Sequence, residues 1–168
     1  MQSRSKMFLM AALMTALPLF TTVYAEGTNK TLELTFSVRN GSGEDPMVVV
    51  WLENSTSEFI RTIRMFSPKK KYHKDLLGWA FKSRTKEKPA DIDAVTGATI
   101  RWNKSATLSI PIKTGTQDLL DGNYILRVES RKDKGNHYRG FKIPMPAGYA
   151  GGVHEDEGYV KSVEIKVK

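Results

Sequence analysis

Residues 93–99, with the sequence Asp-Ala-Val-Thr-Gly-Ala-Thr, hold the residue types whose spacing suggests chemistry. The stretch combines carboxylate, hydroxyl and small side chains at neighbouring positions. A hydroxyl can act as a nucleophile when another group activates it, and small residues let a second molecule approach the backbone closely. The same residues suit a turn, in which Asp93 caps the turn, Thr96-Gly97 adopts a positive φ and Thr99 begins a strand. The residues alone leave both alternatives open.

The spacing in residues 93–99 resembles the motif Asp-x-x-Ser/Thr-Gly-Ala-Thr, on which bacterial flavin transferases attach FMN through a phosphoester to the final threonine. The resemblance implies that Thr99 carries the cofactor and that Asp93 helps to orient the site during attachment. The implied cofactor-binding residues are Asp93, Thr96, Gly97, Ala98 and Thr99. Flavin-acceptor domains resemble small α+β modules in which the motif leads into a helix, whereas residues 100–102 predict a strand here. If the stretch is a turn, we expect no cofactor.

The other candidates for chemistry are three histidines that lie far apart in the sequence, His73, His137 and His154. Zinc sites use closely spaced ligands, so we expect each histidine to be exposed or hydrogen-bonded and predict no metal site. The hydrolase patterns Gly-x-Ser-x-Gly and His-Glu-x-x-His do not occur in the sequence. The chain contains no cysteine, which excludes thiol chemistry and disulfides. These observations predict no catalytic residues and a protein that is not an enzyme.

The N-terminus has the pattern of a Sec-type signal peptide. Arg4 and Lys6 precede an apolar run over residues 7–20, and small residues end the segment at Ala25. We therefore predict a signal peptide over residues 1–25, export to the periplasm and no transmembrane segment after cleavage. Residues 26–168 suffice for a single domain with a hydrophobic core. The net charge of +8 is basic, but nucleic acid is a poor candidate partner for an exported protein.

Short segments with alternating or continuous apolar residues predict an all-β protein. The expected strands are residues 32–39, 47–52, 59–66, 98–102, 107–112, 123–130, 141–145 and 163–167. Residues 40–46 are rich in turn formers, so the first two strands are expected to form a hairpin. Pro111 indicates an edge strand or an irregular one. The pattern favours an immunoglobulin-like antiparallel β-sandwich, with a barrel as the alternative.

The segment Lys69–Lys88 breaks this pattern and predicts a short helical insert. Its lysines and arginines outnumber its acidic residues, so it is expected to be either a solvated face or a surface that attracts anions. Phosphate-bearing cofactors, anionic lipid and acidic protein surfaces fit such a surface. Leu77, Trp79 and Phe81 are expected to cover one end of the sheet core.

Three features in order resemble the family of predicted periplasmic proteins catalogued as domain of unknown function 2271. They are Trp79, residues 93–99, and Asp121-Gly122-Asn123-Tyr124 leading into Leu126-Arg127-Val128-Glu129. The resemblance implies an immunoglobulin-like sandwich, and family members resemble accessory proteins found beside membrane proteins of flavin and iron redox systems. The hypothesis is therefore an exported, non-catalytic accessory or binding protein whose segment Lys69–Lys88 contacts a membrane-associated redox or iron-uptake protein. The alternative is a periplasmic electron carrier with FMN covalently attached at Thr99.

Overall fold

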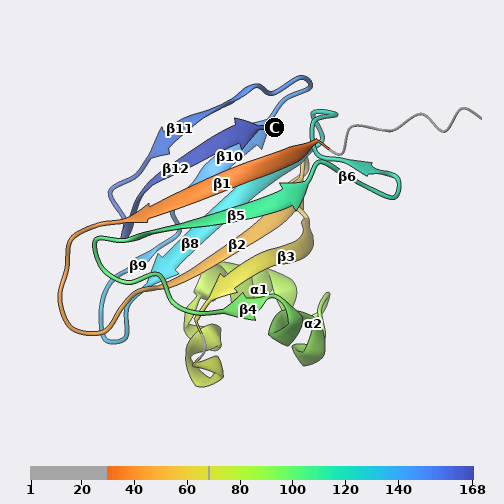
Figure 1. The fold of residues 1–168 in the computed structure, drawn as a ribbon. Helices are drawn as coiled ribbons and strands as arrows, with labels where there is room; N and C mark the ends of the chain where they lie inside the picture. Colours follow the sequence, from red (N-terminus) through yellow and green to blue (C-terminus); the bar gives the residue numbers. More distant parts are fainter. Residues whose placement is uncertain (1–29, 68) are drawn as a thin grey trace, which may run out of the picture.

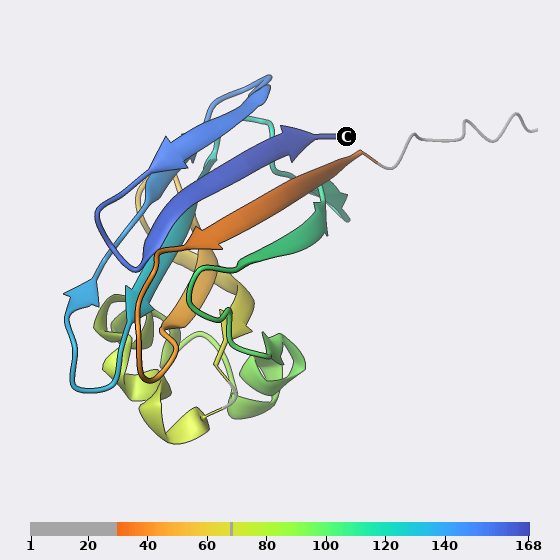
Figure 2. The ribbon, with the colours of Figure 1, turned by 60° about the vertical axis from the view of Figure 1, so that its left-hand side comes forward.

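The computed structural model describes residues 30–67 and 69–168. Figure 1 and Figure 2 show two facing sheets, with the helices gathered on the outside of one of them. The four-stranded sheet has the order β11-β12-β1-β5, and the six-stranded sheet has the order β10-β8-β2-β3-β4, with β9 paired to β8. The prediction of an all-β antiparallel sandwich is confirmed, and β4 adds a short parallel pairing to β3. The barrel alternative is wrong because each sheet has its own edge strands.

The four-stranded sheet contains β1 (Thr31–Val38), β5 (Ser105–Pro111), β11 (Gly151–Glu155) and β12 (Val160–Val167). The six-stranded sheet contains β2 (Met47–Asn54), β3 (Phe59–Phe66), β4 (Thr96–Gly97), β8 (Tyr124–Arg131), β9 (His137–Tyr138) and β10 (Lys142–Met145). A two-stranded ladder joins β6 (Lys113–Thr114) to β7 (Gln117–Asp118). The helices are the 3-10 helix η1 (Lys70–Asp75), α1 (Leu77–Ser83) and α2 (Pro89–Ala94).

The strict alternation in β1 places every second side chain in the space between the two sheets. Leu32, Leu34 and Phe36 are fully buried there, whereas the residues between them are partly exposed. Pro111 lies in β5, which is an edge of the four-stranded sheet, as its missing N–H group predicts.

The apolar run in β2 is buried on both faces, which makes the six-stranded sheet the middle layer of the molecule. Val48, Val50 and Leu52 belong to the core between the sheets. Val49 and Trp51 point to the other face, where they pack with Leu76 and Trp79 of the helical insert. The molecule therefore has three layers, and the insert forms the outermost one.

The predicted helical insert is confirmed, and part of its packing differs from the prediction. Trp79 is buried against the sheet as expected, but Leu77 and Phe81 are exposed and do not cover the core. The reason is that α1 is short and turns a single face, marked by Trp79 and Ser83, toward the sheet. The helix α2 was not among the predicted elements. Its start has a recognisable signal, because Pro89 is its first residue and Asp91 accepts a hydrogen bond from the Lys88 N–H at 2.9 Å.

Two strand predictions are wrong. The strands β1 and β2 do not form a hairpin, because β1 pairs with β5 and β12 whereas β2 pairs with β3 and β8. Residues 98–102 do not form a strand, because they cross from β4 in one sheet to β5 in the other. In this crossing segment the Trp102 N–H donates to Asp45 Oδ1 at 3.0 Å, so a loop side chain takes the place of a strand partner.

The buried carboxylate of Glu129 attaches α1 to the six-stranded sheet. This side chain lies in β8 and is 0% exposed. It accepts hydrogen bonds from the N–H groups of Gly78 and Trp79 at 3.1 and 2.7 Å, in the first turn of α1, where the helix itself offers no acceptor. A Cβ at Gly78 would lie 2.8 Å from a Glu129 oxygen, so glycine permits this close approach. His137 Nε2 contacts the same carboxylate.

Two further carboxylates connect the insert to the sheet. Glu53 of β2 accepts hydrogen bonds from the Trp51 indole at 3.0 Å and from the Lys82 ammonium at 2.7 Å. Glu87, which follows α1, accepts from the Thr62 N–H at 2.7 Å. The Trp79 indole in turn donates to the Thr62 hydroxyl at 2.8 Å. Polar contacts therefore hold the insert at both ends of α1.

We expect Glu129→Ala to lower the free energy of unfolding by about 2–4 kcal/mol, because the buried N–H of Trp79 and the partly buried N–H of Gly78 would lose their acceptor. Glu129→Gln should lower the free energy of unfolding by less, because its amide oxygen still accepts a hydrogen bond. Urea unfolding measures both values. Glu164→Ala is the matched control, because Glu164 forms an exposed ion pair with Lys166 and should change stability by less than about 1 kcal/mol. Equal losses for Glu129→Ala and Glu164→Ala would contradict the assigned role.

Candidate functional site

The motif at residues 93–99 runs from the end of α2 through β4 into the crossing segment. Asp93 forms an ion pair with Lys70 at 2.6 Å, and the Thr96 hydroxyl donates to the Ile92 carbonyl at 2.7 Å. Gly97 pairs in parallel with Phe66 of β3, and Ala98 is exposed. The candidate residues therefore have separate contacts, and the structure does not bring their side chains to one centre.

The alternative prediction, a turn over residues 93–99 that leads into a strand at Thr99, is wrong. Asp93 lies within α2, where its carboxylate pairs with Lys70 and caps no turn. Neither Thr96 nor Gly97 has a positive φ, and Thr99 lies outside the strands. The parallel pairing of Thr96 and Gly97 with β3 sets the direction of residues 93–99 instead.

Thr99 occupies a different environment from the rest of the motif. Its side chain is half-buried, and within residues 30–67 and 69–168 its hydroxyl has no hydrogen-bond partner. The residue lines two cavities, one on each side of the crossing segment. Because no strand pairing holds Thr99, its hydroxyl is available without opening a sheet.

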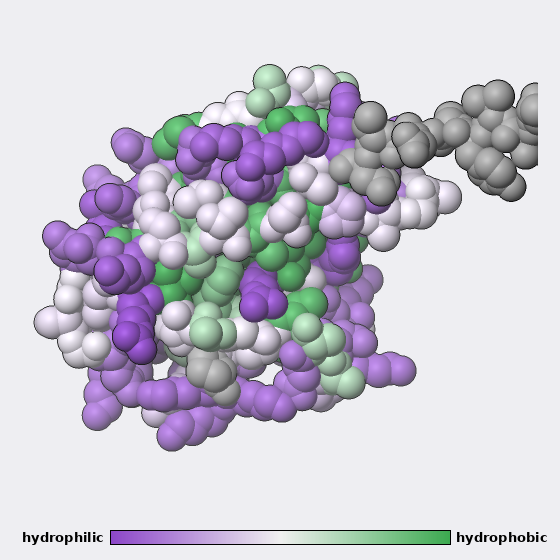
Figure 3. Space-filling view, viewed as in Figure 1, coloured by the Kyte–Doolittle hydropathy of each residue, from purple (hydrophilic) through white to green (hydrophobic). Residues whose placement is uncertain are grey.

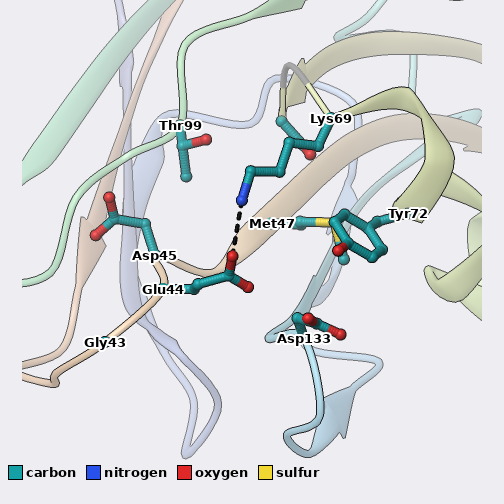
Figure 4. A pocket seen from close by; sticks show the side chains of 9 residues that line it. Gly43, Glu44, Asp45, Met47, Lys69, Tyr72, Thr99 and Asp133 are labelled. Carbon is teal, nitrogen blue, oxygen red and sulfur yellow. Dashed lines mark hydrogen bonds and ion pairs between the residues drawn. The ribbon is translucent and has the colours of Figure 1, made fainter.

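The first cavity, which we call the acidic pocket, has a volume of about 230 Å³. Figure 4 shows Thr99 facing Lys69 across this pocket, with Glu44, Asp45 and Asp133 around it. The Lys69 ammonium donates to Glu44 at 2.7 Å. This hydrogen bond lowers the pKa of Glu44, and Glu44 raises the pKa of Lys69, so the pair stays charged around neutral pH. The two remaining aspartates make the pocket unfavourable for phosphate.

The second cavity, which we call the basic groove, has a volume of about 430 Å³ and lies on the other side of Thr99. Arg64, Arg101 and Lys104 line it, and none of them forms an ion pair with another described residue. The Arg64 guanidinium lies against Gly97, where a Cβ would overlap it, so glycine leaves room for this arginine. Three cations that form no ion pair thus line the same groove as Thr99, and their positive charge makes the groove a suitable environment for an anion.

Sequence reasoning did not single out the residues of the basic groove. Arg101 and Lys104 follow Thr99 by a few positions, so their nearness in sequence was a usable signal. Arg64 reaches the groove from β3, because β4 pairs with Met65 and Phe66. Nothing in the local sequence indicates this contact, since it depends on the pairing of segments that are about thirty residues apart.

The histidines lie apart and have local partners. His73 Nε2 lies 2.8 Å from the Ser67 carbonyl, His137 contacts Glu129, and His154 Nε2 lies 2.7 Å from the Tyr149 hydroxyl. Burial lowers the pKa of His154, which favours its neutral form. The expectation that each histidine is exposed or hydrogen-bonded is confirmed. Within the described part of the chain, no group of three or more histidine, aspartate or glutamate side chains is placed to hold a metal ion.

A protein-family model described as "Predicted periplasmic protein (DUF2271)" matches residues 29–162. The chain belongs to this family. The description of the family supports a periplasmic location for this DUF2271 protein and assigns no activity. No curated protein and no solved structure matches the chain. The predicted signal peptide at residues 1–25 lies outside the described residues, and no helix within the described ranges could span a membrane.

We expect the basic groove to bind inorganic phosphate weakly. The double variant Arg101→Gln/Lys104→Gln should weaken this binding by about 1 kcal/mol, or roughly fivefold, because each exposed charge contributes about 0.5 kcal/mol. Phosphate titration followed by the amide NMR signals of Thr99 and Thr107 measures the affinity. Arg139→Gln is the control, since Arg139 is exposed and does not line the groove. Equal affinity in the double variant and the wild type would contradict the assignment of the groove.

Proposed function

We propose that this protein is a periplasmic electron carrier to which FMN is attached through a phosphoester at Thr99. One observation carries the proposal. Thr99 ends the motif that resembles a flavin-acceptor site, its hydroxyl forms no hydrogen bond among the described residues, and the residue lines the same groove as Arg64, Arg101 and Lys104. The motif and the positive groove are independent features, and both point to a phosphate-bearing group.

The residues present fit the phosphate of FMN. A phosphodiester at Thr99 keeps one negative charge, which the three unpaired cations of the groove would balance. The groove of about 430 Å³ is within the range of small-molecule sites, and it is open to solvent. When bound, FMN supplies one-electron or two-electron transfer. The chain contributes the attachment point, the charges that hold the phosphate and the rigid sandwich that presents them.

The attachment requires a separate transferase and a flavin adenine dinucleotide donor. A bond forms between Thr99 Oγ1 and the phosphorus of the FMN moiety, and the pyrophosphate bond of the donor breaks. AMP leaves, and the hydroxyl proton goes to the solvent or to AMP. Ala98 and Gly97, which precede Thr99, leave little side chain to block the approach of a transferase.

Co-expression with a bacterial flavin transferase should add one FMN, less one water, to the intact mass and produce visible flavin absorption. Thr99→Ala should remove both signals, and Thr99→Ser should retain them because serine supplies the same hydroxyl. Thr107→Ala is the control, because Thr107 lines the same groove and its hydroxyl hydrogen-bonds to Thr35. If the wild-type protein gains no mass in the presence of an active transferase, the carrier proposal fails.

A second candidate function is a non-catalytic accessory or binding protein for a membrane-associated redox or iron-uptake partner. The observation that favours it is the surplus of positive charge on the insert. Its cations that form no ion pair with a described residue are Lys71, Lys74, Arg84, Lys86 and Lys88. Such a surface attracts an acidic partner and speeds their association.

A photo-reactive amino acid at position 85, between Arg84 and Lys86, tests the accessory role in the native cell envelope. We expect a covalent product with a membrane redox or iron-uptake protein, identified by mass spectrometry. The same amino acid at Ser109, which is exposed on β5, serves as the control and should give no such product. If no redox or iron-uptake protein is recovered at position 85, the accessory role is contradicted.

A further inference from the structure

Two large apolar side chains of α1 point to solvent. Leu77 is 53% exposed and Phe81 is 68% exposed. They are four positions apart in a helix, so they are neighbours on one face. Trp79 and Ser83 mark the opposite, buried face of α1. Because that face and the contacts of Glu129 and Lys82 hold the helix, Leu77 and Phe81 protrude from a firmly attached element.

Basic side chains flank this apolar pair. The Arg84 guanidinium lies 4.9 Å from the centre of the Phe81 ring. Lys74 precedes Leu77 by three residues, and neither cation forms an ion pair with a described residue. Figure 3 shows many hydrophilic residues over the lower part of the molecule, where the insert lies in Figure 1. Apolar tips within a basic surround are typical of proteins that lie on membranes.

We propose that the surface formed by Leu77 and Phe81 of α1, together with Lys74 of η1 and Arg84 directly after α1, binds the surface of an anionic phospholipid bilayer. The two apolar side chains enter the headgroup region, and the two cations bind the lipid phosphates. The periplasmic location that the family description supports places the protein next to bilayers. This inference does not depend on FMN or on Thr99.

The size of the apolar surface favours a bilayer over a protein partner. A stable protein interface buries roughly 1,200 Å² or more around a packed apolar centre. Two neighbouring side chains on a short convex helix supply only a small part of that area. A bilayer accepts small protrusions without a complementary pocket, and each basic residue near an anionic surface strengthens binding about fivefold.

Co-sedimentation with vesicles tests the proposal. One set of vesicles contains phosphatidylglycerol and phosphatidylcholine, and the other contains phosphatidylcholine alone. The protein is purified without flavin from the periplasmic fraction, so that all variants share the same processed N-terminus. The wild type should bind the anionic vesicles, and the bound fraction should fall as salt is raised, because salt screens the contribution of the cations.

The double variant Leu77→Ser/Phe81→Ser should lower the partition coefficient at least about tenfold, because two apolar side chains no longer leave water. Lys74→Gln/Arg84→Gln should lower it by about tenfold or more on anionic vesicles only. Val153→Ser is the apolar control, because Val153 is 62% exposed but lies on β11 of the other sheet. Lys142→Gln on β10 is the charge control, and neither control should change binding. Unchanged tryptophan fluorescence, to which the buried Trp51 and Trp79 contribute, checks the fold of each variant.

Three results would overturn the proposal. The first is that the wild type does not bind anionic vesicles at low salt. The second is that it binds both kinds of vesicle equally. The third is that the Leu77→Ser/Phe81→Ser variant binds as well as the wild type. If the protein does not bind vesicles and position 85 crosslinks to an acidic protein, the surface binds a protein partner instead of a bilayer. Failure of FMN attachment leaves each of these outcomes unchanged, so the two proposals can fail separately.

Discussion

The contact between a fully buried carboxylate and the start of α1 is the constraint on which the arrangement of the insert depends. A buried carboxylate needs hydrogen-bond donors in place of water, and Glu129 receives them from the first turn of α1. The helix gains the acceptors that its own backbone lacks. The carboxylate and the free N–H groups of the helix thus supply each other's hydrogen-bond partners, which fixes the start of α1 on the sheet. Glu53 and Glu87 hold the other end of the helix.

This attachment explains why one surface of the insert is free. Trp79 and Leu76 pack against the sheet, where they complete the second apolar cluster with Val49 and Trp51. Leu77 and Phe81 are then left on the outer face with the unpaired cations. A separate contact positions the approach to Thr99, because Thr96 and Gly97 add a short parallel strand to β3 at the edge of the six-stranded sheet.

The two cavities beside Thr99 differ in charge because different loops line them. The loop before β2 brings Glu44 and Asp45 to one side, whereas β3 and the residues before β5 bring arginine and lysine to the other. An anionic group joined to Thr99 would therefore be attracted toward the basic groove and repelled from the acidic pocket. The fold places these charges, so the fold also determines which of the two cavities such a group would enter.

The sequence by itself determined most of the longer elements, because their signals are local, although it missed α2 and placed a strand at residues 98–102 that does not form. Period-two apolar patterns predicted β1 and β8, the continuous apolar run predicted a central β2, and charge with apolar clustering predicted the insert. Only the tertiary structure decided how these elements pair. The expected hairpin of β1 and β2 is wrong because β1 needs one apolar face and β2 needs two, so they join different sheets. The groove around Thr99 likewise depends on Arg64, which long-range pairing brings there, and sequence spacing carries no information on such pairing.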